Sequence, residues 1–176
     1  MKRSRASGLY KGVSPTEQRE PTAIVFESFA DDARARLRRA LIARYGPELG
    51  SEATAEAMAY AWQHWDRVGH MDNAVGYLYR VAQTTVRRHH RWRHTLALPP
   101  ERPQPDFADE QGGRGAELGL PDALARLRPD ERVAVVLVHG HAWGYQEVAD
   151  LLGVPVSTVR NHVHRGLSRL RESLET

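Results

Sequence analysis

The sequence predicts an all-α protein made of two small helical domains joined by a flexible linker. Apolar residues recur at helical spacing through most of the chain, and no segment shows the alternation typical of a β-strand. A stretch rich in proline, glycine and charge, Leu96 to Gly119, divides this helical pattern in two. The 176 residues suit one large domain or two small ones, and the linker favours two.

The composition divides the chain into four parts. The N-terminal part is polar and basic, contains Pro15 and Pro21, and has no apolar core of a secretory signal. We therefore expect a disordered basic tail at 1–21, a first helical domain at 22–94, a linker at 95–119 and a second helical domain at 120–176.

The first domain is expected to contain three helices, at about 22–44, 51–68 and 73–93. Gly46 and Pro47 should end the first helix, and Asp72 or Asn73 can cap the third. In the second domain we expect helices at about 121–127, 130–141, 145–152 and 156–174.

The last two of these helices have the spacing of a helix-turn-helix. Ala149 is small enough to let the two helices approach, and Gly153, four positions later, permits the tight turn. Val159, Val163 and Leu167 fall on one face of the second helix, opposite Asn161 and His164.

The exposed face of this second helix carries hydrogen-bonding groups suited to base edges and arginines suited to phosphates. A helical hairpin with a merely solvated face is the alternative, and the spacing combined with the charge favours DNA. The candidate DNA-binding residues are Ser157, Thr158, Arg160, Asn161, His164, Arg165 and Arg169.

Charges are segregated along the sequence. Lys and Arg total 25 against 22 Asp and Glu, with nine His, a net charge of +3 and a pI of about 9.5. No acidic residue lies between Asp72 and Glu101, or between Asp150 and Glu172, and both stretches contain several arginines. Conversely, the acidic residues from Glu48 to Asp72 meet only Arg67. This predicts two anion-binding surfaces and one acidic surface for another partner.

The expected third helix carries one of the two cationic surfaces. It combines arginines for backbone phosphates with an aromatic ring that can stack on an unpaired base. A solvated arginine face is the alternative, but such faces usually mix charges of both signs. Trp92 either extends the stripe or packs in the core. The candidate residues are Tyr77, Arg80, Thr84, Arg87, Arg88, Arg91 and Trp92.

The composition also argues against several function classes. The chain has no Cys, and no apolar run approaches the length of about 20 residues that a membrane span requires. His90 and His94 have metal-ligand spacing, yet no carboxylate completes a set. No phosphate loop or nucleophile motif is present. We expect a soluble intracellular protein with no cofactor, no metal, no membrane insertion and no catalytic residue.

The segment from Leu127 to Leu174 resembles the C-terminal promoter-reading domain of bacterial sigma-70 factors, of the small extracytoplasmic-function type. The matching features include Leu127 and Pro129, the apolar run 133–138, the segment 144–149, and Thr158-Val159-Arg160 followed by His164-Arg165. The segments AMAYAWQHWDRV and AVGYLYRVAQTTVRRHHRWRH resemble the other sigma domain, which binds core RNA polymerase and melts the −10 element.

The resemblance implies an accessory sigma factor, located in the cytoplasm on the nucleoid, with core RNA polymerase and promoter DNA as partners and an anti-sigma factor as a further candidate. The helix 156–174 would then read the −35 element and the stripe on the third helix would open the −10 element. The candidate core polymerase contacts are Glu52, Glu56, Met58, Tyr60 and Gln63.

The sequence also departs from the family pattern. The stretch 52–58 lacks the Gln and Phe of the family's D-x-x-Q-E-x-F signature, so the chain is a divergent member. Two other interpretations remain open. One is a helix-turn-helix regulator that never docks on polymerase, and the other is a sigma-like interaction protein that does not initiate transcription.

Overall fold

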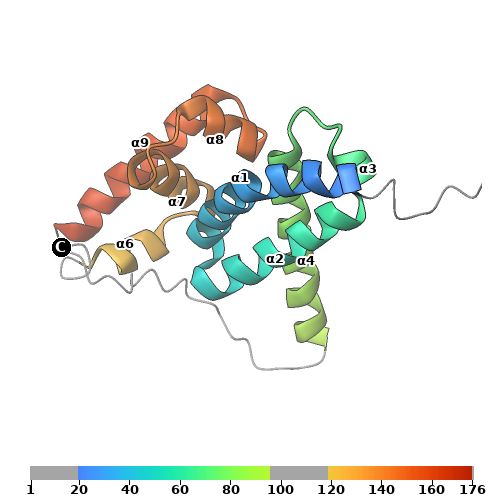
Figure 1. Ribbon diagram of the computed structural model, residues 1–176. Coiled ribbons are helices and arrows are strands. Elements are labelled where there is room, and N and C mark those ends of the chain that lie inside the picture. Colours follow the sequence, from blue (N-terminus) through green and yellow to red (C-terminus); the bar gives the residue numbers. More distant parts are fainter. Residues whose placement is uncertain (1–19, 96–118, 176) are drawn as a thin grey trace, which may run out of the picture.

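The computed structural model describes residues 20–95 and 119–175, and the side chains of 25–88 and 119–175. Every regular element in this part of the chain is a helix (Figure 1), as the sequence predicts, and none of these helices is long and apolar enough to cross a bilayer. The elements are α1 (Glu20–Tyr45), α2 (Pro47–Gln63), α3 (Trp65–Val68), α4 (Ala74–Thr95), α6 (Leu120–Arg126), α7 (Pro129–Val135), η1 (Val136–Gly140), α8 (Tyr145–Leu152) and α9 (Val156–Leu174).

The second helix begins earlier and ends earlier than its sequence pattern indicates. Gly46, with φ of 86°, turns the chain sharply, and Pro47 starts α2 because its fixed φ suits the first helical position. The expected single helix to Val68 is interrupted at His64, where φ is −123°, so the short α3 forms a separate element. Asn73 caps α4, since its Oδ1 accepts the Gly76 N–H at 2.8 Å.

The expected helix 130–141 changes character halfway. It is α-helical only to Val135 and continues as one π turn, in which the His141 N–H donates to the Val136 carbonyl at 3.1 Å. The wider turn brings the next segment back over the domain, and the Trp143 N–H donates to the Leu137 carbonyl at 2.9 Å. Trp143 is thereby buried, with 7% of its surface exposed.

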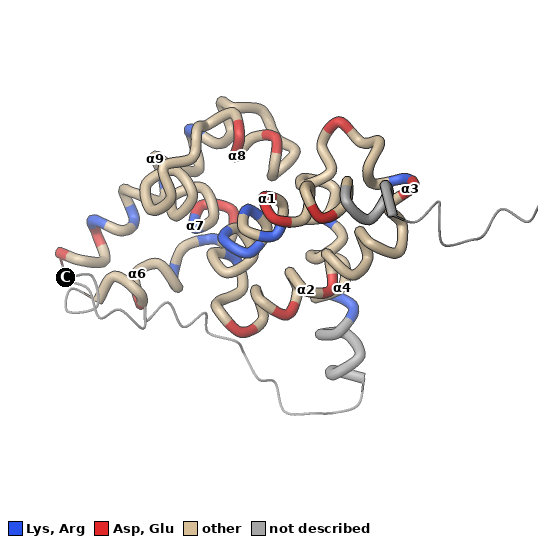
Figure 2. Tube along the Cα trace, in the orientation of Figure 1, with Lys and Arg blue, Asp and Glu red and all other residues tan. Residues whose placement is uncertain are grey.

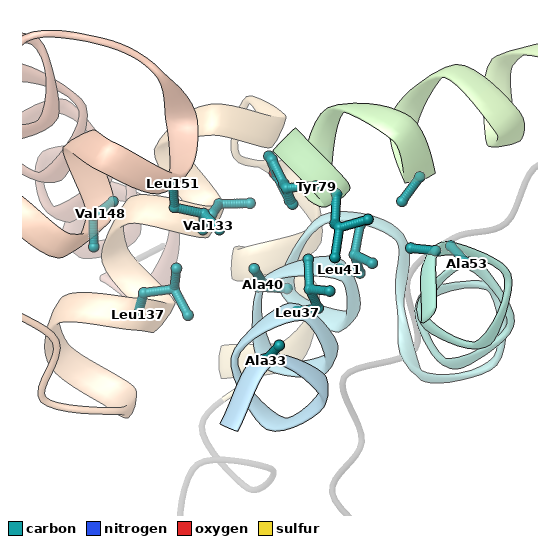
Figure 3. Close-up of a cluster of buried hydrophobic side chains, with 14 of the residues drawn as sticks. Ala33, Leu37, Ala40, Leu41, Ala53, Tyr79, Val133, Leu137, Val148 and Leu151 are labelled. Atoms are coloured by element: carbon teal, nitrogen blue, oxygen red, sulfur yellow. The ribbon is translucent and has the colours of Figure 1, made fainter. Parts of the chain in front are cut away.

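The two halves of the chain share one hydrophobic core. Leu37, Leu41 and Tyr79 from the first half belong to the same buried cluster as Val133 and Leu137 from the second (Figure 3). In Figure 3 these side chains come from α1, α4, α7 and η1 and converge on one region. Burial of such residues is the main driving force for folding, so the halves stabilise each other.

Arg132 on α7 makes the polar connection between the halves. It is 5% exposed, and its guanidinium donates to the carbonyls of Ala43 at 2.7 Å, Arg44 at 2.6 Å and Ala125 at 3.1 Å. The first two carbonyls belong to the last turn of α1, where helical carbonyls lack partners within their own helix. Arg44 in turn donates to the Asp130 carboxylate at 2.5 Å.

A second contact joins the start of α4 to the end of α8. The Asn73 amide donates to the Asp150 carbonyl at 2.7 Å. Gly76 lies so close that a Cβ added there would be 2.8 Å from the same carbonyl. The helix-turn-helix is therefore held against the first half of the chain.

Replacing Arg132 should destabilise the protein strongly. The substitution Arg132→Met keeps an apolar side chain but leaves the α1 carbonyls unsatisfied, so we expect a loss of about 3 kcal/mol in the free energy of unfolding. Urea unfolding of Arg132→Met and of the exposed-site control Arg128→Met measures the difference. Equal midpoints for the two variants would contradict this role.

Because of Tyr79, the free energy of unfolding should decrease with rising pH in the alkaline range. The side chain is 1% exposed, and its hydroxyl lies beside the Arg44 guanidinium without a hydrogen bond of good geometry. Burial raises the pKa of Tyr79 to about 12, and Arg44 opposes the shift. In the unfolded chain the pKa of a tyrosine is about 10, so the neutral phenol of Tyr79 contributes its full stabilisation below that pH. As the pH rises from about 10 to about 12, the free energy of unfolding should fall by about 3 kcal/mol.

The variant Tyr79→Phe tests this, because it retains the ring and removes the unsatisfied hydroxyl. At pH 7 its stability should equal the wild type or exceed it by about 1 kcal/mol. Urea titrations between pH 9 and 12 should show a smaller decline than the wild type shows. Parallel declines would assign the alkaline loss to other groups.

Candidate nucleic-acid interface

The turn between α8 and α9 is a helix-turn-helix joint built on Gly153. Gly153 has φ of 68°, the left-handed conformation that glycine adopts without steric cost, and its N–H donates to the Ala149 carbonyl at 2.8 Å. Pro155, in extended backbone, then precedes α9 as its N-cap residue. As predicted, Gly153 forms the tight turn between α8 and α9, and the small Ala149 is buried.

The α9 helix presents one face to the domain core and one to solvent. Val159 and Val163 are buried, and Gly166 lets α9 approach α7 so closely that a Cβ there would lie 2.6 Å from a methyl of Val135. Thr158 is half-buried. The exposed residues of the predicted set are Ser157, Arg160, Asn161, His164 and Arg165.

Two arginines of the predicted set have partners within the domain. The Arg160 guanidinium lies 5.9 Å from the centre of the Tyr145 ring, a cation–π distance that orients its side chain at the start of α9. Arg169 is half-buried and donates to the carboxylate of Glu131, which is 2% exposed. Arg169 therefore faces α7, and the solvent-facing cations of the set are Arg160 and Arg165.

The second predicted surface lies along α4. Arg80, Thr84, Arg87 and Arg88 are exposed, and Tyr77 is half-buried at the start of the same stripe. The Thr84 hydroxyl donates to the Arg80 carbonyl at 3.0 Å. The side chains of Arg91 and Trp92 lie outside those that the structure describes.

The two surfaces meet where the halves of the chain touch. The Arg80 guanidinium lies beside the helix-turn-helix joint, 3.1 Å from where a Cβ at position 153 would be. Cationic residues recur along α9 in Figure 2, and acidic residues lie on α2. A polyanion could thus be bound by α4 and by α9, from adjacent parts of the fold.

The acidic surface predicted on α2 borders a cleft of about 510 Å³ between α1 and α2. Met58 lies at its floor with 6% of its surface exposed, and Trp62 at its edge with 52% exposed. Arg34 and Arg38 line the α1 side. Of the other predicted contact residues, Glu52 and Gln63 are exposed and Glu56 is half-buried.

Tyr60 lies apart from the rest of its predicted set. Its ring is not part of the cleft, and its hydroxyl lies 2.9 Å from the hydroxyl of Tyr77 on α4. Arg67 on α3 donates to Tyr77 at 2.6 Å and also to Tyr60. Sequence reasoning did not select Arg67 as a site residue, although it is the one Arg or Lys between Glu48 and Asp72.

No metal centre emerges among the described residues, which contain no group of three His, Asp or Glu side chains arranged to hold an ion. His139 and His141 are exposed at the end of η1. Although the residue is exposed overall, partial shielding of its ring from water and the charge of Arg39 lower the pKa of His141, which favours its neutral form. The side chains of His90 and His94 lie outside the described set.

Comparison with known proteins shows similarity to bacterial sigma factors. The family model for sigma-70, region 4, matches residues 118–170. The RNA polymerase sigma-E factor of Streptomyces antibioticus is 34% identical over 121 residues, which cover 68% of this chain and 67% of the relative. The sigma-E factor of Streptomyces coelicolor is 32% identical over 147 residues, which cover 81% and 80%.

More distantly similar proteins are also sigma factors. The ECF RNA polymerase sigma factor SigL of Mycobacterium tuberculosis is 28% identical over 148 residues, covering 77% of this chain and 84% of the relative. A solved structure of the sigma factor RpoE in complex with the anti-sigma factor NepR from Bartonella quintana is 19% identical. It superimposes with a TM-score of 0.64 over 86% of this chain and 97% of that one, and so has the same fold.

Removing cations from α4 should weaken binding of single-stranded DNA and reduce its dependence on salt. If Arg87 and Arg88 each neutralise one phosphate, the double alanine variant should lower the slope of log K against log salt by about 1.4. Anisotropy titrations of a labelled oligonucleotide at several salt concentrations measure this. The variant Arg128→Ala serves as control, and an unchanged slope in the double variant would refute the assignment.

Proposed function

Because the chain belongs to the extracytoplasmic-function sigma factors of the sigma-70 family, we propose that it binds core RNA polymerase as an accessory sigma factor and directs transcription from a specific class of promoters. The observation that carries the proposal is the pair of exposed cationic helix faces, one in each half, in a chain whose relatives align across both halves. A factor that reads two promoter elements needs two such faces.

We assign the −35 element to α9. Its first two turns expose Ser157, Arg160 and Asn161, and the N-terminal part of a recognition helix is the part that reaches base edges in the major groove. Asn161 can read adenine and Arg160 guanine by bidentate hydrogen bonds, while Arg165 can bind a phosphate. Thr158 and His164 complete the proposed contact face.

We assign opening of the −10 element to α4. Arg80, Arg87 and Arg88 can follow the phosphates of a single strand, and Tyr77 offers a ring on which an unpaired base can stack. Arg91 and Trp92 stay part of this proposal on the strength of the sequence. On this assignment residues 22–94 form the domain that melts DNA, and residues 120–176 the domain that reads it.

Core polymerase would dock on the acidic side of α2. Glu52, Glu56 and Gln63 lie on this helix next to the cleft floored by Met58, and the exposed Trp62 adds apolar area of the kind that interfaces bury. The residues 95–119 would connect the two DNA-binding domains within the enzyme. An anti-sigma factor is a further proposed partner, and it would compete for these surfaces.

The protein itself needs no catalytic group for this function, since the polymerase carries out the chemistry. We expect it to act in the cytoplasm, at the nucleoid, because its partners are core polymerase and promoter DNA.

The first test is transcription by purified core polymerase, free of other sigma factors, on sheared genomic DNA with and without this protein. We expect discrete new start sites preceded by shared −35 and −10 elements at fixed spacing. A stable complex with core but no initiation would support the interaction-protein alternative, and the absence of both would favour a regulator that works without polymerase.

Two matched double variants separate the proposed roles. Replacing Arg80 and Arg88 with Ala should abolish strand opening while −35 preference is kept, because only α4 is altered. Replacing Arg160 and Asn161 with Ala should relax −35 choice, lowering discrimination by about tenfold per base contact, a value within the range for bidentate contacts. The same defect in both variants would argue against the division of roles.

A further inference from the structure

Three side chains from three helices converge beside the stripe on α4. The hydroxyls of Tyr60 on α2 and Tyr77 on α4 are 2.9 Å apart, and Arg67 on α3 donates to the Tyr77 hydroxyl at 2.6 Å and to Tyr60. The Arg67 guanidinium also lies 5.6 Å from the centre of the Tyr77 ring. The Tyr77 side chain is therefore fixed both at its hydroxyl, by Tyr60 and Arg67, and at its ring, by the Arg67 guanidinium.

The break between α2 and α3 makes this arrangement possible. His64 stands at the break, its ring stacked on that of Tyr60 at 4.1 Å and 19°, with its Nδ1 3.0 Å from the Tyr60 carbonyl. Because α3 is a separate turn, Arg67 is brought back toward Tyr60 and Tyr77. In a continuous helix Arg67 would lie on the same face as Tyr60 but about 10 Å further along the axis.

We propose that Arg67 is a positioning residue for promoter opening, which holds the Tyr77 ring in the orientation that stacks on an unpaired base, with Tyr60 as second support. This proposal rests on the function assigned above to Tyr77. An aromatic side chain fixed before binding loses less rotational freedom when the base arrives, so a larger part of the stacking energy stabilises the open strand.

The geometry separates this role from two simpler ones. If Arg67 bound a phosphate directly, its removal would weaken opening whether or not Tyr77 were present. If it only stabilised the fold, its removal would lower stability and affect −35 reading and −10 opening alike. A positioning role requires that its effect disappear when Tyr77 is absent.

The test is a double-mutant cycle with Arg67→Ala, Tyr77→Ala and the double variant, each as the full chain bound to core polymerase. The readout is permanganate reactivity of unpaired thymines at a promoter found in the transcription experiment. We expect about tenfold less opening for Tyr77→Ala, in line with the loss of one stacked base, and a smaller reduction for Arg67→Ala. The double variant should match Tyr77→Ala.

Conservative variants keep the test decisive if a truncation fails to fold. Tyr77→Phe keeps the ring and its contact with the Arg67 guanidinium but loses both hydroxyl contacts, and should open the promoter less well than the wild type and better than Tyr77→Ala. Arg67→Lys retains a cationic donor and should restore part of the activity. The variant Arg128→Ala, an exposed arginine in the other half, serves as the charge-matched control and should open the promoter like the wild type.

Each other outcome overturns the proposal. Wild-type opening by Arg67→Ala and Tyr77→Phe would mean that the ring needs no support. Additive defects in the double variant would assign Arg67 a contact of its own with DNA. Wild-type opening by Tyr77→Ala, with opening still lost in the Arg80 and Arg88 double variant, would overturn the role of Tyr77 while leaving the sigma factor function intact.

Discussion

The fold depends on the way one buried guanidinium completes a helix that belongs to the other half of the chain. Arg132 on α7 donates to the carbonyls of Ala43 and Arg44, which end α1, and to Ala125. The three carbonyls and the negative end of the helix dipole offset part of the cost of burying this charge, while burial and the nearby charge of Arg44 lower the pKa of Arg132. The apolar packing of Leu37 and Leu41 against Val133 then forms around this fixed point.

The same packing places the two proposed DNA-binding surfaces next to each other. Asn73, which caps α4, lies against the end of α8, and Arg80 on α4 lies beside the joint at Gly153, so the proposed melting surface begins close to the proposed reading helix. The acidic side of α2 and its cleft are formed with α1 instead. Polymerase and DNA would therefore meet different faces of the molecule, as the segregation of charge in the sequence indicates.

Local patterns predicted most of the helices and the helix-turn-helix, because helical periodicity, caps and a left-handed glycine act over a few residues. The break at His64 and the π turn after Val135 were not predicted, since tertiary packing selects them over a continuous helix. For the same reason the sequence grouped Tyr60 with the acidic contacts, and it gave no sign that Arg67 supports Tyr77. The pairing of Arg169 with the buried Glu131 could not be read from the sequence either, because 38 residues separate the two.

Where the start of α4 meets the end of α8, the two neighbouring positions 76 and 150 should differ in the amino acids that they accept. Position 150 takes part through its backbone carbonyl, while its carboxylate accepts a separate hydrogen bond from Gln146 at 2.8 Å. Many residues could therefore replace Asp150 without loss of the contact. Position 76 has no such freedom, because even the methyl group of alanine would meet that carbonyl at 2.8 Å. Mutational tolerance at this junction should thus differ sharply between two positions that touch.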